Sequence, residues 1–229
     1  MELNRRLACL AALVPPGCIA ADIGTDHAYL PIYLVEKDVC RVVIATDIKD
    51  GPFRTAAGKI KEHQVEDRVI LRQGDGLKVL NPLEADVLVL AGMGGNTIRE
   101  ILSASPHILS GAKRMLLQPM ADAADLRFWL CDNGWRIADE QLVEEDGRVY
   151  LIIVAEPGRE VTTDPIHLEL GPRLLEKKDP LLKGYLEKII SKYERILAEI
   201  AAAKSDLARE KALSLEKKVA KIKEVAGCL

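Results

Sequence analysis

Apolar residues in the first two thirds of the chain form short continuous runs, most of which stop at an acid, an amide or a glycine. Such runs, without polar alternation, are typical of strands buried on both faces of a parallel sheet. Helix-period segments separate them, so the pattern predicts successive βα units. The predicted strands cover residues 18–22, 41–47, 69–73, 86–91 and 114–119.

Helices are predicted before and between these strands. Pro15 and Pro16 end the first of them, and Gly134 ends the last. Asp50 is the expected N-cap of the third. The predicted helices cover residues 3–14, 28–37, 52–63 and 122–133.

The pattern changes after residue 134. Two segments, residues 135–144 and 148–155, flank Asp146 and Gly147, a dipeptide that favours a hairpin turn. Five βα-type strands followed by an antiparallel pair are typical of class I S-adenosylmethionine-dependent methyltransferases, whose seven-stranded Rossmann-like sheet has its last strand antiparallel. A dinucleotide-binding Rossmann domain is expected to stay parallel, so the sequence predicts the methyltransferase arrangement.

Pro157 and Gly158 mark the expected domain boundary. It separates a Rossmann-like methyltransferase domain at residues 1–158 from a C-terminal coiled-coil helical domain at residues 159–229. The second domain is expected to begin with a linker, because prolines recur there. The linker prolines are Pro165, Pro172 and Pro180.

Two helical runs come after this linker, with apolar residues at steps of four and three, which predicts an antiparallel helical hairpin that turns near Lys204. Such seams serve a hairpin and a dimer equally, so a monomer or a weak homodimer is expected. The seam residues are Leu182, Leu186, Ile189, Tyr193, Ile196, Ile200 and Ala203, then Ala208, Ala212, Leu215, Val219, Ile222 and Ala226.

Charge and cysteine content narrow the class of protein. The formal net charge of −3 over 229 residues argues against coating nucleic acid by bulk charge alone. From Arg159 onward, 15 Lys and Arg stand against 12 Asp and Glu, so a mildly basic region follows an acidic one. Five cysteines without a C-x-x-C pair support neither a disulfide framework nor a metal site. With no long apolar run, a soluble cytoplasmic protein that contacts no membrane is expected.

Acids and glycines gather where the predicted strands end. Ligands of open α/β sheets bind beyond these ends, where Asp22, Gly24 and Asp47 fall. An acid after the second strand commonly binds a ribose diol, so Asp22 and Asp47 together indicate one bound nucleoside. Asp75 lies in a Gly-Asp-Gly turn and can accept from an exocyclic amine. Three glycines within residues 92–95 suit a flat group lying against the main chain.

Four motifs, in their order along the chain, resemble those of one known family. They are Asp-Ile-Gly-Thr-Asp-His-Ala-Tyr-Leu-Pro at 22–31, Gly-Asp-Gly-Leu at 74–77, Ala-Gly-Met-Gly-Gly at 91–95 and Leu-Gln-Pro at 117–119. Generic methyltransferases carry further glycines where this chain has Thr25, Asp26 and His27, so the first motif is the most specific. Followed by a heptad tail, the motifs resemble those of the bacterial tRNA (adenine-22-N1)-methyltransferase family, TrmK, over nearly the whole chain.

The resemblance implies that S-adenosyl-L-methionine donates a methyl group to N1 of adenine 22 in the tRNA D-arm, with the C-terminal helices helping to hold the tRNA. The implied cofactor site consists of Asp22, Ile23, Gly24, Asp47, Ile48, Asp75, Gly76, Ala91 and Gly92. The implied catalytic centre, around the methyl group and the target base, consists of Asp26, His27, Tyr29, Gly92, Met93, Gly94, Gly95, Gln118 and Pro119. Candidate RNA contacts are Arg5, Arg6, Lys188, Lys192, Lys217, Lys218 and Lys221.

The implied reaction needs positioning more than a general base, because N1 of neutral adenine has a free lone pair. The base must leave its stack at a cost of a few kcal/mol, and stacking on Tyr29 is expected to return about 1–3 kcal/mol. Asp26 is a hypothetical acceptor for the exocyclic amine as positive charge develops.

Alternative interpretations stay open at this point. Asp47 and His27 also suit helix capping, Tyr29 core packing, and the lysines a solvated helix face. Competing functions are methylation of a small molecule or protein, dinucleotide-dependent oxidoreduction, and noncatalytic recruitment of a partner by the helical tail. The first function predicts activity that does not depend on residues 160–229, together with no salt-sensitive RNA binding. The lack of a complete G-x-G-x-x-G argues against the second, and the acids at the strand ends argue against the third.

Overall fold

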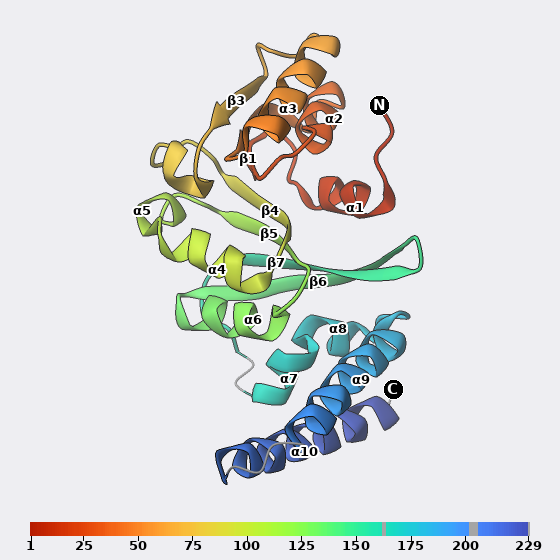
Figure 1. Ribbon diagram of the computed structural model, residues 1–229. Helices are drawn as coiled ribbons and strands as arrows, with labels where there is room; N and C mark the ends of the chain where they lie inside the picture. The colour runs from red at the N-terminus through yellow and green to blue at the C-terminus, as the bar shows by residue number, and fades with distance from the viewer. Residues whose placement is uncertain (162–163, 202–205, 229) are drawn as a thin grey trace. The chain divides into compact units, whose positions relative to one another are not determined.

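The computed structural model describes residues 1–161, 164–201 and 206–228. The chain divides into two compact units, Met1–Val161 and Thr162–Leu229. The first unit contains a seven-stranded sheet with helices, and the described part of the second is helical (Figure 1).

The sheet of the first unit has the order β3-β2-β1-β4-β5-β7-β6. Strands β1 to β5 are parallel, and β7 lies antiparallel between β5 and β6. The predicted class I methyltransferase topology is therefore confirmed. The strands are β1 (Cys18–Ile23), β2 (Cys40–Asp47), β3 (Val69–Gln73), β4 (Val87–Met93), β5 (Arg114–Pro119), β6 (Trp135–Glu145) and β7 (Arg148–Pro157).

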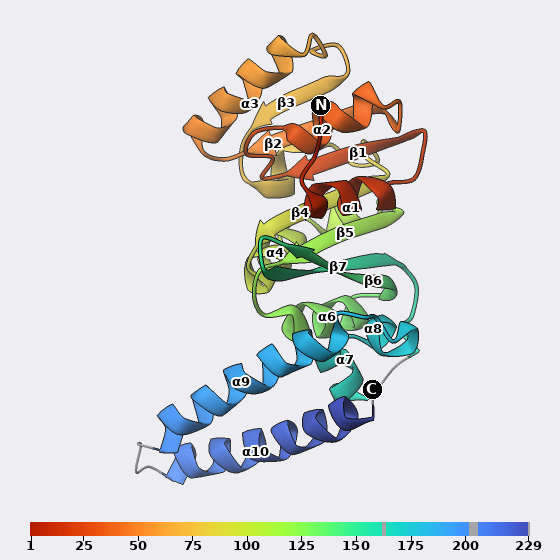
Figure 2. The same ribbon diagram turned by 90° about the vertical axis from the view of Figure 1, so that its right-hand side faces the viewer.

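Helices α1, α2 and α3 cover one face of the sheet, and α4, α5 and α6 cover the other (Figures 1 and 2). Alternate strand residues serve the two faces: Val89 and Leu116 pack with the first group of helices, while the equally buried Leu88 and Leu117 point the opposite way. The helices are α1 (Arg5–Leu13), α2 (Tyr29–Glu36), α3 (Asp50–Glu62), α4 (Gly95–Ser103), α5 (Pro106–Leu109) and α6 (Ala123–Asp132), with a 3₁₀ turn, η1 (Gly76–Val79).

Two local details differ from the sequence predictions. Lys49, not Asp50, is the N-cap of α3; Asp50 is the first helical residue and pairs with Arg54, with Oδ2 and Nε 3.0 Å apart. An acid in the first turn still favours the helix through its dipole. Helices α4 and α5 are absent from the predictions, although the buried Ile98 and Leu102 of α4 are four residues apart.

The second unit contains α7 (Pro165–Leu170), α8 (Pro172–Lys177), α9 (Leu182–Ala201) and α10 (Asp206–Gly227). The expectation of a linker at Pro165 and Pro172 is wrong, because each proline begins a short helix, where its fixed φ and missing N–H cost nothing. No helix among the described residues is both long and apolar enough to cross a bilayer.

Helices α9 and α10 pack along each other (Figure 2). Leu186 and Ile222 of the predicted seams are fully buried. Ala203 and the predicted turn near Lys204 lie outside the described residues. The pairing of the helices agrees with the predicted hairpin, and the coiled-coil packing itself stays a prediction.

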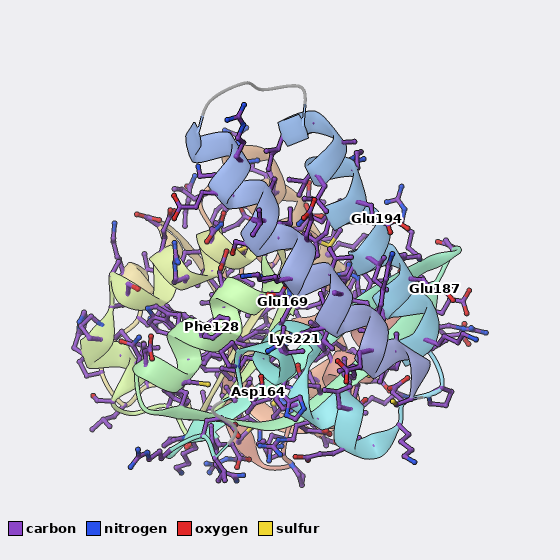
Figure 3. All side chains as sticks on the ribbon, turned by 90° about the horizontal axis from the view of Figure 1, so that it is seen from below. Phe128, Asp164, Glu169, Glu187, Glu194 and Lys221 are labelled. Carbon is purple, nitrogen blue, oxygen red and sulfur yellow. The ribbon has the colours of Figure 1, made fainter. Side chains whose placement is uncertain are left out.

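Glu169 of α7 ties the helices of the second unit together (Figure 3). Its Oε1 accepts from the Tyr193 hydroxyl of α9, and its Oε2 lies 2.7 Å from Nζ of Lys218 of α10. The same ammonium lies 5.2 Å from the centre of the Tyr193 ring. Lys218, a predicted RNA contact, is therefore engaged within the unit.

Candidate active site

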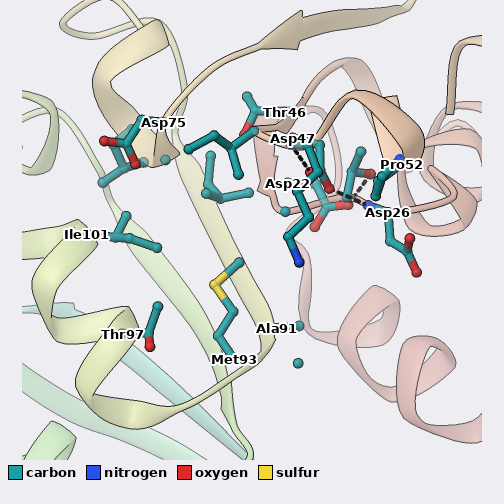
Figure 4. Close-up of a pocket in the computed structure, with 18 of the residues that line it drawn as sticks. Asp22, Asp26, Thr46, Asp47, Pro52, Asp75, Ala91, Met93, Thr97 and Ile101 are labelled. Carbon is teal, nitrogen blue, oxygen red and sulfur yellow. Dashed lines mark hydrogen bonds between the residues drawn. The ribbon is translucent and has the colours of Figure 1, made fainter. Parts of the chain in front are cut away.

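A cleft of about 1030 Å³ opens where β1, β2 and β4 end (Figure 4). The loops after β1, β2, β3 and β4 form its walls together with α1 and α4. This is the edge of the sheet that the sequence predicts for ligand binding. The predicted residues that line it are Arg6, Asp22, Ile23, Gly24, Asp26, His27, Tyr29, Asp47, Ile48, Asp75, Gly76, Ala91, Gly92 and Met93.

Asp47 ends β2 and is held by two backbone donors. The Asp26 N–H donates to its Oδ2 at 3.2 Å, and the Lys49 N–H donates to its Oδ1 at 2.9 Å. The residue is only 8% exposed. Because each carboxylate oxygen has a further lone pair, Asp47 can still accept from two neighbouring hydroxyls without moving.

Asp22 ends β1 and is 6% exposed. Burial raises the pKa of its carboxyl to about 6; the hydrogen bond from Thr25 Oγ1 to Oδ2, at 2.7 Å, lowers it, the charge of Asp47 raises it, and the charge of Arg6 lowers it. Burial disfavours the ionised form, so a cation placed beside Asp22 would lower this pKa again. The carboxylate therefore suits a positively charged group of a ligand.

Gly24 makes the turn that brings these two acids together. Its φ is +75°, which a residue with a Cβ rarely adopts, and a Cβ there would also clash with the Met93 methyl. The N–H groups of Gly24 and Thr25 both donate to the Thr46 carbonyl oxygen at 2.8 Å. The loop that follows β1 is thus hydrogen-bonded to the C-terminal end of β2.

Asp75 and Gly76 form another part of the wall. The Asp75 carboxylate is half exposed and lies 2.5 Å from Nζ of Lys78, measured from Oδ2. Gly76 has a φ of +56°, and a Cβ there would come within 2.9 Å of Cγ2 of Ile101. The turn therefore keeps a narrow gap beside an apolar side chain, which suits a flat ring.

Asp26, His27 and Tyr29 form the rim of the cleft, with the side chains of Asp26 and His27 66% and 45% exposed. Asp26 and Ala28 both adopt left-handed backbone, with φ of 54° and 56°, a strained arrangement that is commonest at functional sites. The His27 and Tyr29 rings stack with centroids 5.4 Å apart. An exposed aromatic pair beside a cleft offers a surface on which a base can stack.

Four of the predicted catalytic residues lie outside the cleft lining within the fully described first unit: Gly94, Gly95, Gln118 and Pro119. A Cβ on Gly95 would clash with the Asp122 carbonyl oxygen, so this glycine serves close packing of α4 on the loop before α6. Gln118 is completely buried, and its Oε1 accepts from the Gly92 N–H at 3.1 Å. It therefore contacts the cleft wall at Gly92 from the interior of the protein.

Other residues of the cleft lining were not among the sequence predictions. Thr97 and Ile101 lie one helical turn apart directly after the glycine-rich stretch, and this spacing is the signal that could have revealed them. Arg5, a candidate RNA contact, is exposed on α1 and does not line the cleft. The additional lining residues include Asn4, Leu7, Lys49, Pro52, Thr97 and Ile101.

The strand order and the paired acids at adjacent strand ends define a class I S-adenosylmethionine-dependent methyltransferase fold. A family model described as tRNA (adenine(22)-N(1))-methyltransferase, TrmK, matches residues 20–224. The chain belongs to this family.

Individual relatives agree over the full length. The curated tRNA (adenine(22)-N(1))-methyltransferase of Bacillus subtilis (strain 168) is 36% identical over 98% of this chain and 97% of its own. The crystal structure of the B. subtilis m1A22 tRNA methyltransferase TrmK superposes with a TM-score of 0.90 at 33% identity, covering 98% of this chain and 99% of that one. Streptococcus pneumoniae Sp1610, solved in complex with S-adenosyl-L-methionine, has a TM-score of 0.87 at 32% identity, covering 98% and 100%.

Proposed function

We propose that this protein transfers a methyl group from S-adenosyl-L-methionine to N1 of adenine 22 in tRNA. The observation that carries the proposal is one cleft holding two buried acids, Asp22 and Asp47, at adjacent strand ends of a chain that matches the TrmK family from residue 20 to residue 224. Methylation of a small molecule or a protein is the alternative.

The chemistry of the cleft fits the cofactor part by part. Asp47 would accept from the two ribose hydroxyls, because its backbone partners fix it and leave lone pairs free. Asp22 would face the positively charged methionine end, which suits a buried carboxylate of raised pKa. Asp75 and Gly76 would border the adenine, with Ile101 against its ring. Ile23, Ile48 and Ala91 supply the remaining wall.

The bound cofactor supplies an activated methyl group on a sulfonium. The residues of the chain then have to hold the acceptor nitrogen in line with that methyl group and keep water out, since adenine N1 carries its own lone pair. His27 and Tyr29 would stack against the extruded base and offset part of the cost of unstacking. Gly92 and Met93 would face the base from the end of β4.

Binding of tRNA is supported by cations of the second unit. Lys188, Lys192 and Arg195 follow one another at four and three residues along α9 and line a shallow hollow, which also includes the acid Glu187. Arg195 is not among the sequence predictions, although the same spacing points to it. Lys217 and Lys221 are exposed on α10. A row of cations on one helix face suits a phosphate backbone, and we propose that the cytoplasmic tRNA pool is the source of substrate.

The test is methyl transfer from labelled S-adenosyl-L-methionine to unmodified tRNA transcripts. One transcript carries adenine at position 22, and its matched control carries guanine there and is otherwise identical. Incorporation into the first alone is expected. Incorporation into neither, with cofactor binding intact by calorimetry, would leave a methyltransferase with a different substrate.

A further inference from the structure

Gly92 is an extra residue in β4. On the neighbouring β5, Gln118 lies opposite Ala91 and Pro119 lies opposite Met93, so Gly92 has no partner in the ladder. A bulge of this kind leaves one backbone N–H unpaired and turns the strand, here with φ of +76° at Gly92. The bulge faces the cleft, which Gly92 lines.

The buried side chain of Gln118 takes over the missing pairing. Its Oε1 accepts from the Gly92 N–H at 3.1 Å and, at the same time, from Nη1 of Arg6 at 2.7 Å. Its Nε2 donates to the Pro119 carbonyl oxygen at 3.3 Å. Both groups facing Oε1 are donors, so only one orientation of the amide satisfies them.

Arg6 reaches this amide from helix α1. The side chain of Asn4 caps the helix by accepting from the Leu7 N–H at 2.9 Å, and the Arg6 N–H donates to Oε2 of Glu145 at 2.9 Å. The guanidinium carbon lies 5.5 Å from the centre of the Tyr150 ring. Helix, carboxylate and ring together hold Arg6 in place, and its charge strengthens the hydrogen bond to Gln118.

We propose that Arg6 is a positioning residue for methyl transfer: through the amide oxygen of Gln118 it holds the Gly92 bulge in the form that receives the target base. This inference rests on the proposed function. Without Arg6, the Gln118 oxygen keeps the hydrogen bond from the Gly92 N–H but loses the charge-assisted hydrogen bond that anchors the amide to α1, so the side chain can shift together with the bulge. The bulge would then lose its fixed geometry while Asp22 and Asp47 kept theirs.

The experiment compares Arg6→Ala, Gln118→Ala and the double variant in steady-state methylation of the adenine-22 transcript. Arg6→Ala is expected to lower kcat about 10- to 100-fold with the KM for tRNA and for S-adenosyl-L-methionine little changed. The double variant is expected to be no slower than the slower single variant, because both remove the same link. Losses that multiply in the double variant would overturn the proposal.

If Arg6 contacts a phosphate of the tRNA instead, a different result is expected. In that case Arg6→Ala raises the KM for tRNA, lowers the slope of log(kcat/KM) against log salt by about 1, and leaves the rate at saturating tRNA unchanged. Arg148→Ala, which removes an exposed arginine at the start of β7, is the matched control for loss of charge and is expected to leave kcat unchanged.

Two milder variants guard against misfolding. Arg6→Lys keeps a cationic donor for Gln118 and is expected to recover part of the rate, and Gln118→Glu keeps an oxygen that accepts from both donors and is expected to exceed Gln118→Ala. Unchanged kcat in Arg6→Ala would overturn the positioning role while wild-type activity still supported the proposed function. Absence of wild-type activity on either transcript would instead refute the proposed function.

Discussion

The floor of the cleft, Asp22 and Asp47, and its rim, Asp26, His27 and Tyr29, differ in how firmly they are held. The floor acids are buried and receive hydrogen bonds from Thr25 and from two backbone N–H groups. The rim residues are all partly exposed, and the contacts of their side chains are mainly with one another. We infer that the floor is formed before any ligand arrives, whereas the rim is completed by its substrate.

The largest expected effect tests the fixed floor. Asp47→Ala should weaken binding of S-adenosyl-L-methionine by about 100-fold, because two hydrogen bonds to a charged group are lost. Asp75→Ala, at a half-exposed carboxylate, should weaken it by less than about tenfold. Calorimetry measures both, with thermal melting as the control for folding. Equal losses in the two variants would mean that burial of Asp47 gives it no advantage.

Asp22 provides a second test of the floor, in stability. A folded-state pKa of about 6 against an ordinary value of 3.8 means that the native protein holds its proton longer than the unfolded chain. Stability therefore falls as the pH rises from about 4 to about 6 and stays lower above that range, by about 3 kcal/mol. Asp22→Asn should remove this loss, so it should melt at a higher temperature than wild type at pH 7.5 and not at pH 4.

Binding of a cationic ligand to Asp22 should have the opposite pH dependence. Affinity for S-adenosyl-L-methionine should be full above about pH 7 and fall by up to about tenfold per pH unit below pH 6, as the carboxylate takes up a proton. Asp22→Asn should bind weakly with no such dependence. A wild-type affinity that is constant from pH 5 to pH 8 would place the cation of the cofactor elsewhere.

The role of the rim is tested through stacking of the target base on Tyr29. Tyr29→Ala should raise the KM for tRNA by roughly 5- to 150-fold, the equivalent of about 1–3 kcal/mol of stacking, and leave cofactor binding unchanged. Tyr29→Phe keeps the ring and should resemble wild type. A Phe variant as impaired as the Ala variant would assign the effect to the hydroxyl.

The smallest effect is expected at Asp26. Its carboxylate is solvated and its role in holding Asp47 belongs to the backbone N–H, so Asp26→Asn should change cofactor affinity by less than about threefold. Single-turnover methylation measures the separate hypothesis that Asp26 accepts from the exocyclic amine. A full rate in the Asn variant would remove that hypothesis.

Sequence patterns predict the sheet, its closing hairpin and most of the cleft, because strand ends of a doubly wound sheet have a fixed relation to the ligand site. Asp22, Asp47 and Asp75 could be placed for that reason alone. The sequence did not show which glycines of residues 91–95 line the cleft and which serve packing. Gly92 lines the cleft and Gly95 packs on a carbonyl oxygen, and both look alike in sequence.

Features that depend on side-chain direction were beyond the sequence patterns. Gln118 was expected beside the methyl group, but the alternation along β5 turns it into the interior, where the Gly92 bulge needs an acceptor. Lys218 was expected on the outer face of the helical hairpin, but its Nζ donates a hydrogen bond to Oε2 of Glu169 within the second unit. Pro165 and Pro172 were interpreted as linker residues, because a proline that starts a helix differs from a proline in a linker only in the conformation of the residues after it.

The insertion of β7 between β5 and β6 also bears on how the chain is made. β5 emerges from the ribosome well before β7, so the growing sheet has an open edge along β5 while residues 120–157 are synthesised, for about 2–8 s at roughly 5–20 residues per second. An open edge is a template for pairing with other chains. Docking of the hairpin is therefore the event that protects the nascent protein, and substitutions that slow the Asp146–Gly147 turn should lower its soluble yield before they affect methylation.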